Sequence, residues 1–279
     1  MKMVYNWINI IQDYLLPPTC ILCGNPGHDS RDICHSCYTK LPRNNHCCYQ
    51  CAEILEISTA DPAQSCWTIP AQHPSGASRA KPLPAVLCGR CLSRQPAFDE
   101  TVAPFIHQGA IRHLISTLKF GANYKNARLL GMLLADHLTN LSGTDLHLPE
   151  GCRAGKTDMQ QTADRPDLIL PVPLHKARYR QRGFNQAIEI ARIVGRELQI
   201  PLDLTSCKRN RDTPHQTQLP AKKRRKNLKN AFSIVKPIHA QHIAILDDVM
   251  TTGSTAHELA YALKKAGASR VDVWVCARA

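Results

Sequence analysis

The sequence feature that most constrains the fold is a run of 13 residues, Ile243–Thr255, which reads IAILDDVMTTGST. Its uninterrupted apolar start is typical of a central strand in a parallel sheet that is covered on both faces. Two carboxylates, Asp247 and Asp248, end this strand, and a helical pattern begins after a short loop. Because open α/β sheets bind ligands at the carboxyl ends of their strands, we predict a ligand site here.

The loop after the acidic pair has the composition of a phosphate site. Gly253 lets a ligand approach the backbone closely, and the positive end of the following helix favours an anion. Hydroxyl donors are added by Thr251, Thr252, Ser254 and Thr255. Since carboxylates can hold ribose hydroxyls, the run predicts a sugar-phosphate site. It resembles the phosphoribosyl-pyrophosphate (PRPP) motif of the type I phosphoribosyltransferases, in which an apolar strand and two acidic residues precede a Thr-Gly-x-Thr-like loop.

The cysteines supply the second constraint, because eight of the 13 fall in four C-x-x-C pairs. Each pair places two thiolates on one tight turn, and two such turns can close a tetrahedron around zinc. The pairs are Cys20/Cys23, Cys34/Cys37, Cys48/Cys51 and Cys88/Cys91. We predict one zinc site from the first two pairs and another from the last two, with interleaved pairing left open. Four thiolates leave no open coordination position, so about two zinc ions would have a structural role.

The amino-terminal segment and the cysteine usage bear on the compartment. Residues Met1–Leu16 have apolar residues at helical spacing, and polar residues interrupt any secretory h-region, so we interpret them as an amphipathic docking helix. No segment has the roughly 18 consecutive apolar residues of a membrane span. Paired C-x-x-C units without a secretory signal indicate zinc sites in a reducing compartment, which predicts a cytoplasmic protein.

The chain divides into two predicted modules. Residues 1–100 are expected to form an amino-terminal helix, their only clear helix, and a double zinc-ribbon module with an inserted loop at 56–87. Strand and helix patterns alternate over residues 101–279, which predicts a parallel sheet flanked by helices and so an α/β fold. The expected strands are 101–107, 167–173, 202–207, 231–235, 243–246 and 270–277. The expected helices are 111–121, 126–141, 184–198 and 254–266, and a polar surface loop is expected at 142–166.

A second basic element follows the strand at 167–173 and precedes a helix. It is interpreted as a loop at the same sheet edge as the acidic pair. Type I phosphoribosyltransferases place a pyrophosphate-binding loop at a corresponding strand end, and arginine forks suit a polyphosphate. The candidate residues are Lys176, Arg178, Arg180, Arg182 and Gly183. The alternative is a basic loop that only caps a helix.

The formal charge of +13 is concentrated in one window. Residues 205–236 contain ten Lys or Arg and one Asp, a net charge of 10 − 1 = +9. Such a window attracts polyanions, whether phosphate ligands or nucleic acid, although a solvated basic loop has the same composition. Residues 208–230 lack an apolar period and are expected to be a loop or mobile flap.

Two sequence patterns narrow the resemblance to the ComF family of competence proteins. One is the run Arg180–Gln186, and the other is Thr213-x-x-Gln216-x-x-Leu219-x4-Arg224-x-x-Asn227-x3-Ala231-Phe232. The segment Cys88-Gly89-Arg90-Cys91 is similar to the double zinc ribbon at the start of those proteins. The family implies a PRPP-type domain, a zinc module and a role in handling DNA that is taken up. It also implies a flexible flap that closes on the ligand, with Arg209, Thr213, Gln216 and Arg224 as its candidate residues.

The function predicted from these motifs is binding of PRPP with Mg²⁺ and transfer of its 5-phosphoribosyl group. Asp247 and Asp248 would hold the ribose hydroxyls and stabilise a cation-like ribose, while residues 251–255 would bind the 5-phosphate. Purine transferases of the hypoxanthine-guanine kind carry an Asp shortly before the loop glycine. Thr251 and Thr252 stand there in this chain, which disfavours a 6-oxopurine acceptor. The sequence does not name the acceptor.

A different class of function shares the same motifs. The zinc ribbons and the basic window also suit a regulatory or single-stranded-DNA-binding protein that keeps the PRPP fold without turnover. A third hypothesis joins both, with a transferase that acts on DNA or is tethered to the DNA-uptake machinery. Steep loss of affinity with salt is expected for the DNA-binding hypothesis, but aromatic residues, which stack on bases, make up only 5% of the chain.

Overall fold

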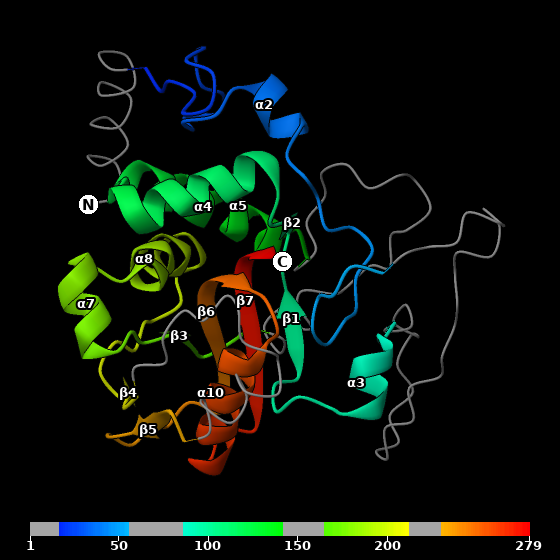
Figure 1. The fold of residues 1–279 in the computed structure, drawn as a ribbon, viewed down its shortest axis with the longest axis vertical. Helices are drawn as coiled ribbons and strands as arrows, with labels where there is room; N and C mark the ends of the chain where they lie inside the picture. The colour runs from blue at the N-terminus through cyan, green and yellow to red at the C-terminus, as the bar shows by residue number, and fades with distance from the viewer. Residues whose placement is uncertain (1–16, 56–85, 142–164, 212–229) are drawn as a thin grey trace, which may run out of the picture.

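The computed structural model describes residues 17–55, 86–141, 165–211 and 230–279 (Figure 1). The expected docking helix at Met1–Leu16 lies outside these residues, as do nearly all of the 56–87 and 142–166 loops and of the flap. Within the described residues, no helix is both long enough and apolar enough to cross a membrane.

A parallel sheet forms the centre of the molecule. Its strand order is β1-β7-β6-β3, with β2 also paired to β7, and all of these pairings are parallel. The strands are β1 (Glu100–Val102), β2 (Phe105–Ile106), β3 (Leu168–Pro171), β6 (His242–Met250) and β7 (Arg270–Arg278). Helices cover both of its faces, which confirms the predicted α/β class.

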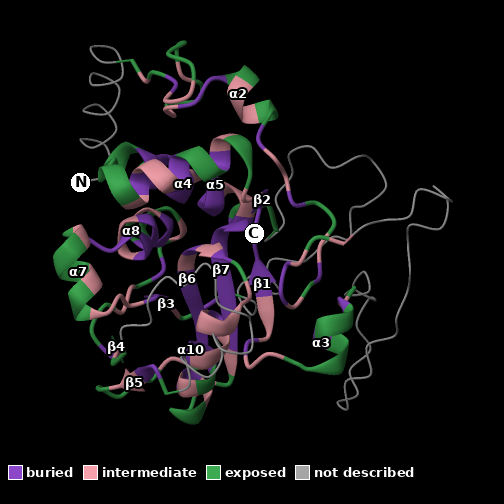
Figure 2. Cartoon of the chain, viewed as in Figure 1, coloured by how far each residue is buried: buried purple, intermediate pink, exposed green. Residues whose placement is uncertain are grey.

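The two faces of the sheet are covered by different helices. Ala244 and Leu246 of β6 pack on the side of α4, α5 and α8, whereas Ile243 and Ile245 pack on the side of α10. The helices are α4 (Gly109–Gly121), α5 (Tyr124–Leu141), α8 (Gln186–Leu198) and α10 (Ser254–Lys265). Alternation of side chains along a strand explains this division. Buried residues therefore fill the middle strands (Figure 2).

The cysteine pairs begin two short helices that were not expected. Cys34 is the N-cap of α2 (His35–Thr39), and Cys88 is the N-cap of α3 (Gly89–Ser93). The prediction that residues 1–100 have a clear helix only at their start was therefore wrong. In α2 the backbone N–H of Cys37 donates to Sγ of Cys34 over 3.4 Å, so the turn that brings two thiols together continues as a helical turn.

The basic segment after β3 is a helix, α7 (Lys176–Arg182), where a loop was expected. His175 accepts a hydrogen bond from the N–H of Ala177 through Nδ1, and Gly183 ends the helix with φ of 81°. Lys, Arg and Gln are good helix formers, and a cap at each end lets so short a segment form.

Three strand predictions differ from the structure. The strand expected at 202–207 is mostly a turn, because the carboxylate of Asp203 accepts from the N–H groups of Thr205 and Ser206. The strand there is β4 (Cys207–Arg209), which pairs antiparallel with β5 (Phe232–Ile234). The strand expected at 101–107 is split into β1 and β2, and Pro104, which lies between them, has no N–H to donate. The strand expected to stop at Leu246 continues to Met250.

Candidate functional site

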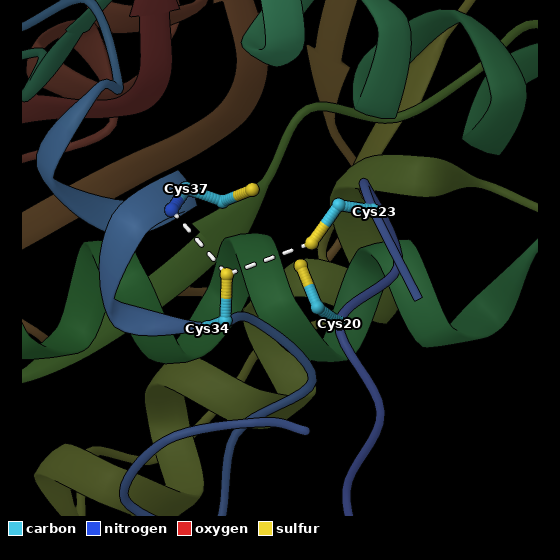
Figure 3. A group of neighbouring side chains, drawn as sticks. All are labelled: Cys20, Cys23, Cys34 and Cys37. Carbon is cyan, nitrogen blue, oxygen red and sulfur yellow. Dashed lines mark hydrogen bonds between the residues drawn. The ribbon is translucent and has the colours of Figure 1, made fainter. Parts of the chain in front are cut away.

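The first cysteine cluster has the geometry of a zinc site. The sulfur atoms of Cys20, Cys23, Cys34 and Cys37 all lie within 4.8 Å of one another (Figure 3). The Sγ atoms of Cys23 and Cys34 are 3.6 Å apart. A tetrahedral ion with Zn–S bonds of about 2.3 Å needs sulfurs about 3.8 Å apart, so these residues fit zinc.

The second cluster joins Cys48 and Cys51 to Cys88 and Cys91, again with all four sulfurs within 4.8 Å of one another. Sequential pairing is therefore correct and interleaved pairing is excluded. A hydrogen bond from the Cys51 thiol lowers the pKa of Cys48 to about 4, so one ligand is held as a thiolate. None of the described cysteines forms a disulfide. Both clusters suit structural zinc.

The acidic pair lies inside a strand and not after it, which separates the two carboxylates. Asp247 continues the row of Ile243 and Ile245 and lines a cavity with Ile245 on the α10 side. Asp248 continues the row of Ala244 and Leu246 and meets α4 on the other side. Their charges still interact, because the residues are adjacent. The two carboxylates therefore face different layers of the molecule.

Asp248 is held by a residue that the sequence analysis did not name. Nζ of Lys119, near the end of α4, lies 2.6 Å from Oδ2 of Asp248, whose side chain is only 4% exposed. Burial raises the pKa of this carboxyl, but the Lys119 ammonium, together with hydrogen bonds from Asp247 and from the N–H of Val249, leaves the pKa of Asp248 below its ordinary value. Asp248 is therefore an anion with a cation already beside it.

Asp247 has the opposite electrostatic character. Burial, and after it the charge of Asp248, raises the pKa of Asp247 to about 8. Its carboxyl shares a cavity of about 50 Å³ with the loop Thr251–Thr255. That volume exceeds the roughly 10–15 Å³ that one water needs, so a small group can enter. Asp247 therefore ionises less readily than Asp248 and stands beside a loop of hydrogen-bond donors.

The loop after β6 is shaped by Gly253. This residue has φ of 73° and is the N-cap of α10, a conformation that favours glycine. A Cβ built on it would lie 3.2 Å from Sδ of Met250 and 3.7 Å from Cζ of Phe98. The hydroxyls of Thr252 and Ser254 are 2.9 Å apart. The loop thus gathers hydroxyls at a helix N-terminus, as the sequence predicted.

Among the basic candidates of α7, Arg182 is the one tied to the acidic pair. Burial lowers the pKa of Arg182, while the charges of Asp248 and Asp247 act to raise it. Its Nη1 donates to Oε1 of Gln186 over 2.6 Å. Lys176, Arg180 and Gly183 are exposed, and Arg178 is half-buried.

Of the four candidate flap residues, one lies among the residues that the structure describes and three do not. Arg209 lies in β4, with its guanidinium carbon 5.7 Å from the centre of the Phe232 ring. Thr213, Gln216 and Arg224 lie outside the described residues, so their place relative to the acidic pair stays a prediction.

Sequence reasoning missed two cations that the tertiary structure brings to this region. Lys119 has the appearance of an ordinary cation in the last turn of an amphipathic helix, and no local pattern links it to Asp248. Arg278 is only 2% exposed, and its guanidinium donates to the carbonyls of Cys51 and Met250. The sequence carried a weak indication of this role for Arg278, because it directly follows the apolar run of the last strand, and an arginine is unusual at a buried position.

Comparison with known proteins adds family information to this geometry. Residues 11–92 match the double zinc ribbon domain family. DNA utilization protein YhgH of Escherichia coli K12 is 33% identical over 266 residues, which cover 94% of this chain and 98% of that protein. Competence protein F of Haemophilus influenzae is 35% identical over 196 residues, which cover 69% of this chain and 78% of that protein.

Two further similarities are more partial. Competence protein ComFC of Bacillus subtilis is 31% identical over 121 residues, 41% of this chain and 47% of that protein. A purine phosphoribosyltransferase structure from Pyrococcus horikoshii covers 54% of this chain and 80% of its own, at 17% identity and a TM-score of 0.28, which is too low to bear on substrate. The extensive matches to YhgH and competence protein F decide the family: the chain belongs to the ComF family.

Proposed function

We propose that this protein binds PRPP together with Mg²⁺ and transfers the 5-phosphoribosyl group to an acceptor that the sequence does not name. The observation that carries the proposal is the cavity shared by Asp247 and the loop Thr251–Thr255 at the carboxyl end of β6. A carboxyl group and a loop of donors at a helix N-terminus suit a ribose and its phosphate, respectively.

In this proposal each part of PRPP is bound by a different set of residues. The loop at 251–255 binds the 5-phosphate, and Asp247 and Asp248 take the ribose hydroxyls. Lys119 and Arg182, with the other basic residues of α7, neutralise the pyrophosphate. The carboxylates suit Mg²⁺, which prefers oxygen ligands and would supply charge neutralisation of the pyrophosphate when bound. Both cations already lie within electrostatic reach of Asp248.

In the proposed reaction the bond between C1 of the ribose and the pyrophosphate oxygen breaks, and pyrophosphate leaves with the electron pair. A bond from the acceptor nucleophile to C1 forms, and the acceptor loses a proton. The negative charge of the acidic pair stabilises the cation-like ribose between these events. No carboxylate precedes Gly253 in the loop, so a 6-oxopurine acceptor stays disfavoured.

The same proposal covers organisation and location. We divide the chain into a zinc-ribbon module at 1–100 and a phosphoribosyltransferase-like domain at 101–279. The flap residues Arg209, Thr213, Gln216 and Arg224 are proposed to close over the ligand and exclude water. Eight cysteines used as zinc ligands suit a reducing compartment, so we place the protein in the cytoplasm.

Calorimetric titration with Mg²⁺ and PRPP tests this function. Asp248→Asn and Asp247→Asn are each expected to lower affinity at least about tenfold, or about 1.4 kcal/mol. Asp29→Asn is the matched control, because Asp29 is exposed in the first zinc region, has a positive φ that Asn tolerates, and lies away from the site. Equal affinity in wild type and both site variants would contradict the assignment. Pyrophosphate release with candidate nucleophiles then tests turnover.

The second candidate function is binding of single-stranded DNA without turnover. The aromatic residues are few, but Phe120 is 82% exposed, and its ring centre lies 5.9 Å from the guanidinium carbon of Arg182. Tyr124 and Tyr179 are also exposed. Exposed aromatics beside arginines suit stacking on bases. A steep fall in affinity for single strands with rising salt, without pyrophosphate release under any condition, would favour this function.

A further inference from the structure

A groove of about 300 Å³ separates the second zinc cluster from the loop after β6. One wall is α3 with the chain that follows it, and the other is the first turn of α10. The polar residues that line it are Arg90, Ser93, Arg94, Gln95, Thr252, Ser254, His257 and Glu258. This volume lies at the lower end of the roughly 300–1,000 Å³ of small-molecule sites.

Arginine gives the groove a place for an anion. Two arginines, Arg90 and Arg94, line it together with one carboxylate, Glu258, and with Cys51 and Cys91 of the second cluster. Arg90 also contacts Glu53 over 2.8 Å, so Arg94 is the cation with most freedom to meet a ligand. His257 accepts the N–H of Ala97 at Nδ1 over 2.9 Å, which ties the first turn of α10 to the chain after α3.

The groove adjoins the proposed 5-phosphate site. Thr252, Gly253 and Ser254 line both the groove and the smaller cavity that holds the carboxyl of Asp247. The buried ring of Phe98 forms part of the groove and lies under Gly253. A group bound to the loop can therefore have a neighbour in the groove, along a path that runs from Asp247 over the loop to α3.

We propose that this groove binds the next nucleotide of a single strand whose last sugar occupies the acidic pair. The proposal rests on the proposed function, because it places the 5-phosphate of that sugar on the loop at 251–255. That phosphate would then be a diester, with one arm to the sugar at Asp247 and the other to the nucleotide between α3 and α10. The Arg94 guanidinium in the groove can pair with the phosphate of that nucleotide.

The acidic pair gives the strand a direction. A phosphate on the 3′ oxygen of that sugar would bring negative charge against the anionic carboxylate of Asp248, whose partner Lys119 is already engaged. A sugar with a free 3′ hydroxyl can instead donate a hydrogen bond to that carboxylate. The strand therefore ends in the site with its 3′ terminus, and the chain runs back toward its 5′ end through the groove.

Fluorescence anisotropy at constant salt tests this arrangement with single-stranded DNA of roughly six nucleotides, labelled at the 5′ end. We expect the strand with a free 3′ hydroxyl to bind at least about tenfold more tightly than the same strand with a 3′ phosphate. PRPP with Mg²⁺ should displace it, because both ligands use the loop. Equal affinity for the two strands, or simultaneous binding of PRPP and strand, would overturn the proposal.

Charge reversal in the groove separates this proposal from the function on which it rests. Arg94→Glu is expected to weaken strand binding at least about tenfold and to change PRPP affinity less than about twofold. Arg196→Glu, an equal charge change at an exposed residue of α8, is the control and should leave strand binding near wild type. If both variants bind the strand alike, the groove is not used. If wild type fails to bind PRPP, the proposed function fails, and the strand measurements still decide the groove.

Discussion

Each of the two zinc clusters consists of four cysteines, but the two clusters lie against opposite faces of the sheet. Cys20 and Cys34 of the first cluster belong to the core that includes α4, α5 and α8. All four cysteines of the second cluster belong to the core that includes α10. Figure 1 shows the same separation, with α2 above α4 and α5, and α3 at the lower right, past β1.

The contacts of the two clusters with the rest of the chain also differ. The first is tied to α5 by an ion pair between Arg31 and Asp136, which are 2.8 Å apart with side chains 25% and 33% exposed. The second is tied to the sheet by Arg278, which donates to the carbonyl of Cys51 over 3.0 Å and to that of Met250 over 3.1 Å. Arg278 also contacts the carboxylate of Glu53.

This difference gives the two clusters unequal links to the proposed phosphate loop. Met250 is the last residue before the proposed phosphate loop, and Phe98, which follows the last cysteine pair, lies under Gly253. Residues next to the second cluster, Met250 and Phe98, therefore also contact or adjoin the loop. The first cluster supports helices on the other face. Changes in the second should reach the ligand, whereas matched changes in the first should affect stability alone.

The largest expected effect is the loss of one cysteine ligand from each cluster. Cys91→Ala is expected to remove zinc from the second cluster and to abolish PRPP binding. Cys23→Ala should remove zinc from the first cluster but leave PRPP affinity within about threefold, because the loop keeps its support. Each structural zinc contributes on the order of 10 kcal/mol to folding, so both variants should melt earlier. Zinc content by mass spectrometry and calorimetric titration check this, and equal loss of PRPP affinity in both variants would break the comparison.

A smaller effect is expected from the arginines that tie each cluster to the core. Arg278→Met leaves the Cys51 and Met250 carbonyls without their donor and should lower the free energy of unfolding by about 3 kcal/mol. Arg31→Met removes a partly exposed ion pair and should cost about 0.5–1 kcal/mol. Denaturant unfolding of both variants measures the difference. Equal costs would show that Arg278 has no special role beside the second cluster.

Two glycines with positive φ sharpen the comparison further. Gly253 has φ of 73° and little space for a Cβ, while Gly24, in the first cluster, has φ of 78° and nothing within 4 Å. Alanine at either position should cost about 1–2 kcal/mol of stability from backbone strain. Only Gly253→Ala is expected to weaken PRPP binding, by about tenfold. Parallel unfolding and binding measurements check this, and weaker binding in Gly24→Ala would contradict it.

The last prediction is a pH dependence on the side of the second cluster. The pKa of Asp247 is raised to about 8, so between about pH 4 and pH 8 the folded state holds a proton that the unfolded chain has lost. The free energy of unfolding should therefore fall as pH rises through this window. PRPP affinity should rise from pH 6 to pH 8, because the ionised carboxylate binds Mg²⁺ and ribose. Asp247→Asn should flatten both profiles, and unchanged profiles in that variant would exclude Asp247 as the titrating group.

The predictable parts of the molecule were those with short-range causes. The spacing of the C-x-x-C pairs was enough to predict both metal clusters, because each pair needs only one tight turn. The run Ile243–Thr255 was enough to predict a central strand, a donor loop and a helix, since their periods and the glycine are local. The helical form of α7 was missed because a basic composition suggested a loop, although its residues favour a helix.

The features that only the tertiary structure decided depend on residues far apart in the chain. The continuation of β6 to Met250 follows from pairing with β7, and it turns Asp247 and Asp248 toward different layers. Lys119 meets Asp248 only because α4 packs on that face, and Arg278 meets Cys51 only because the last strand passes the second cluster. Such contacts depend on how layers pack and not on local spacing. The sequence therefore determined which chemical groups the protein has, and packing decided which of them stand together.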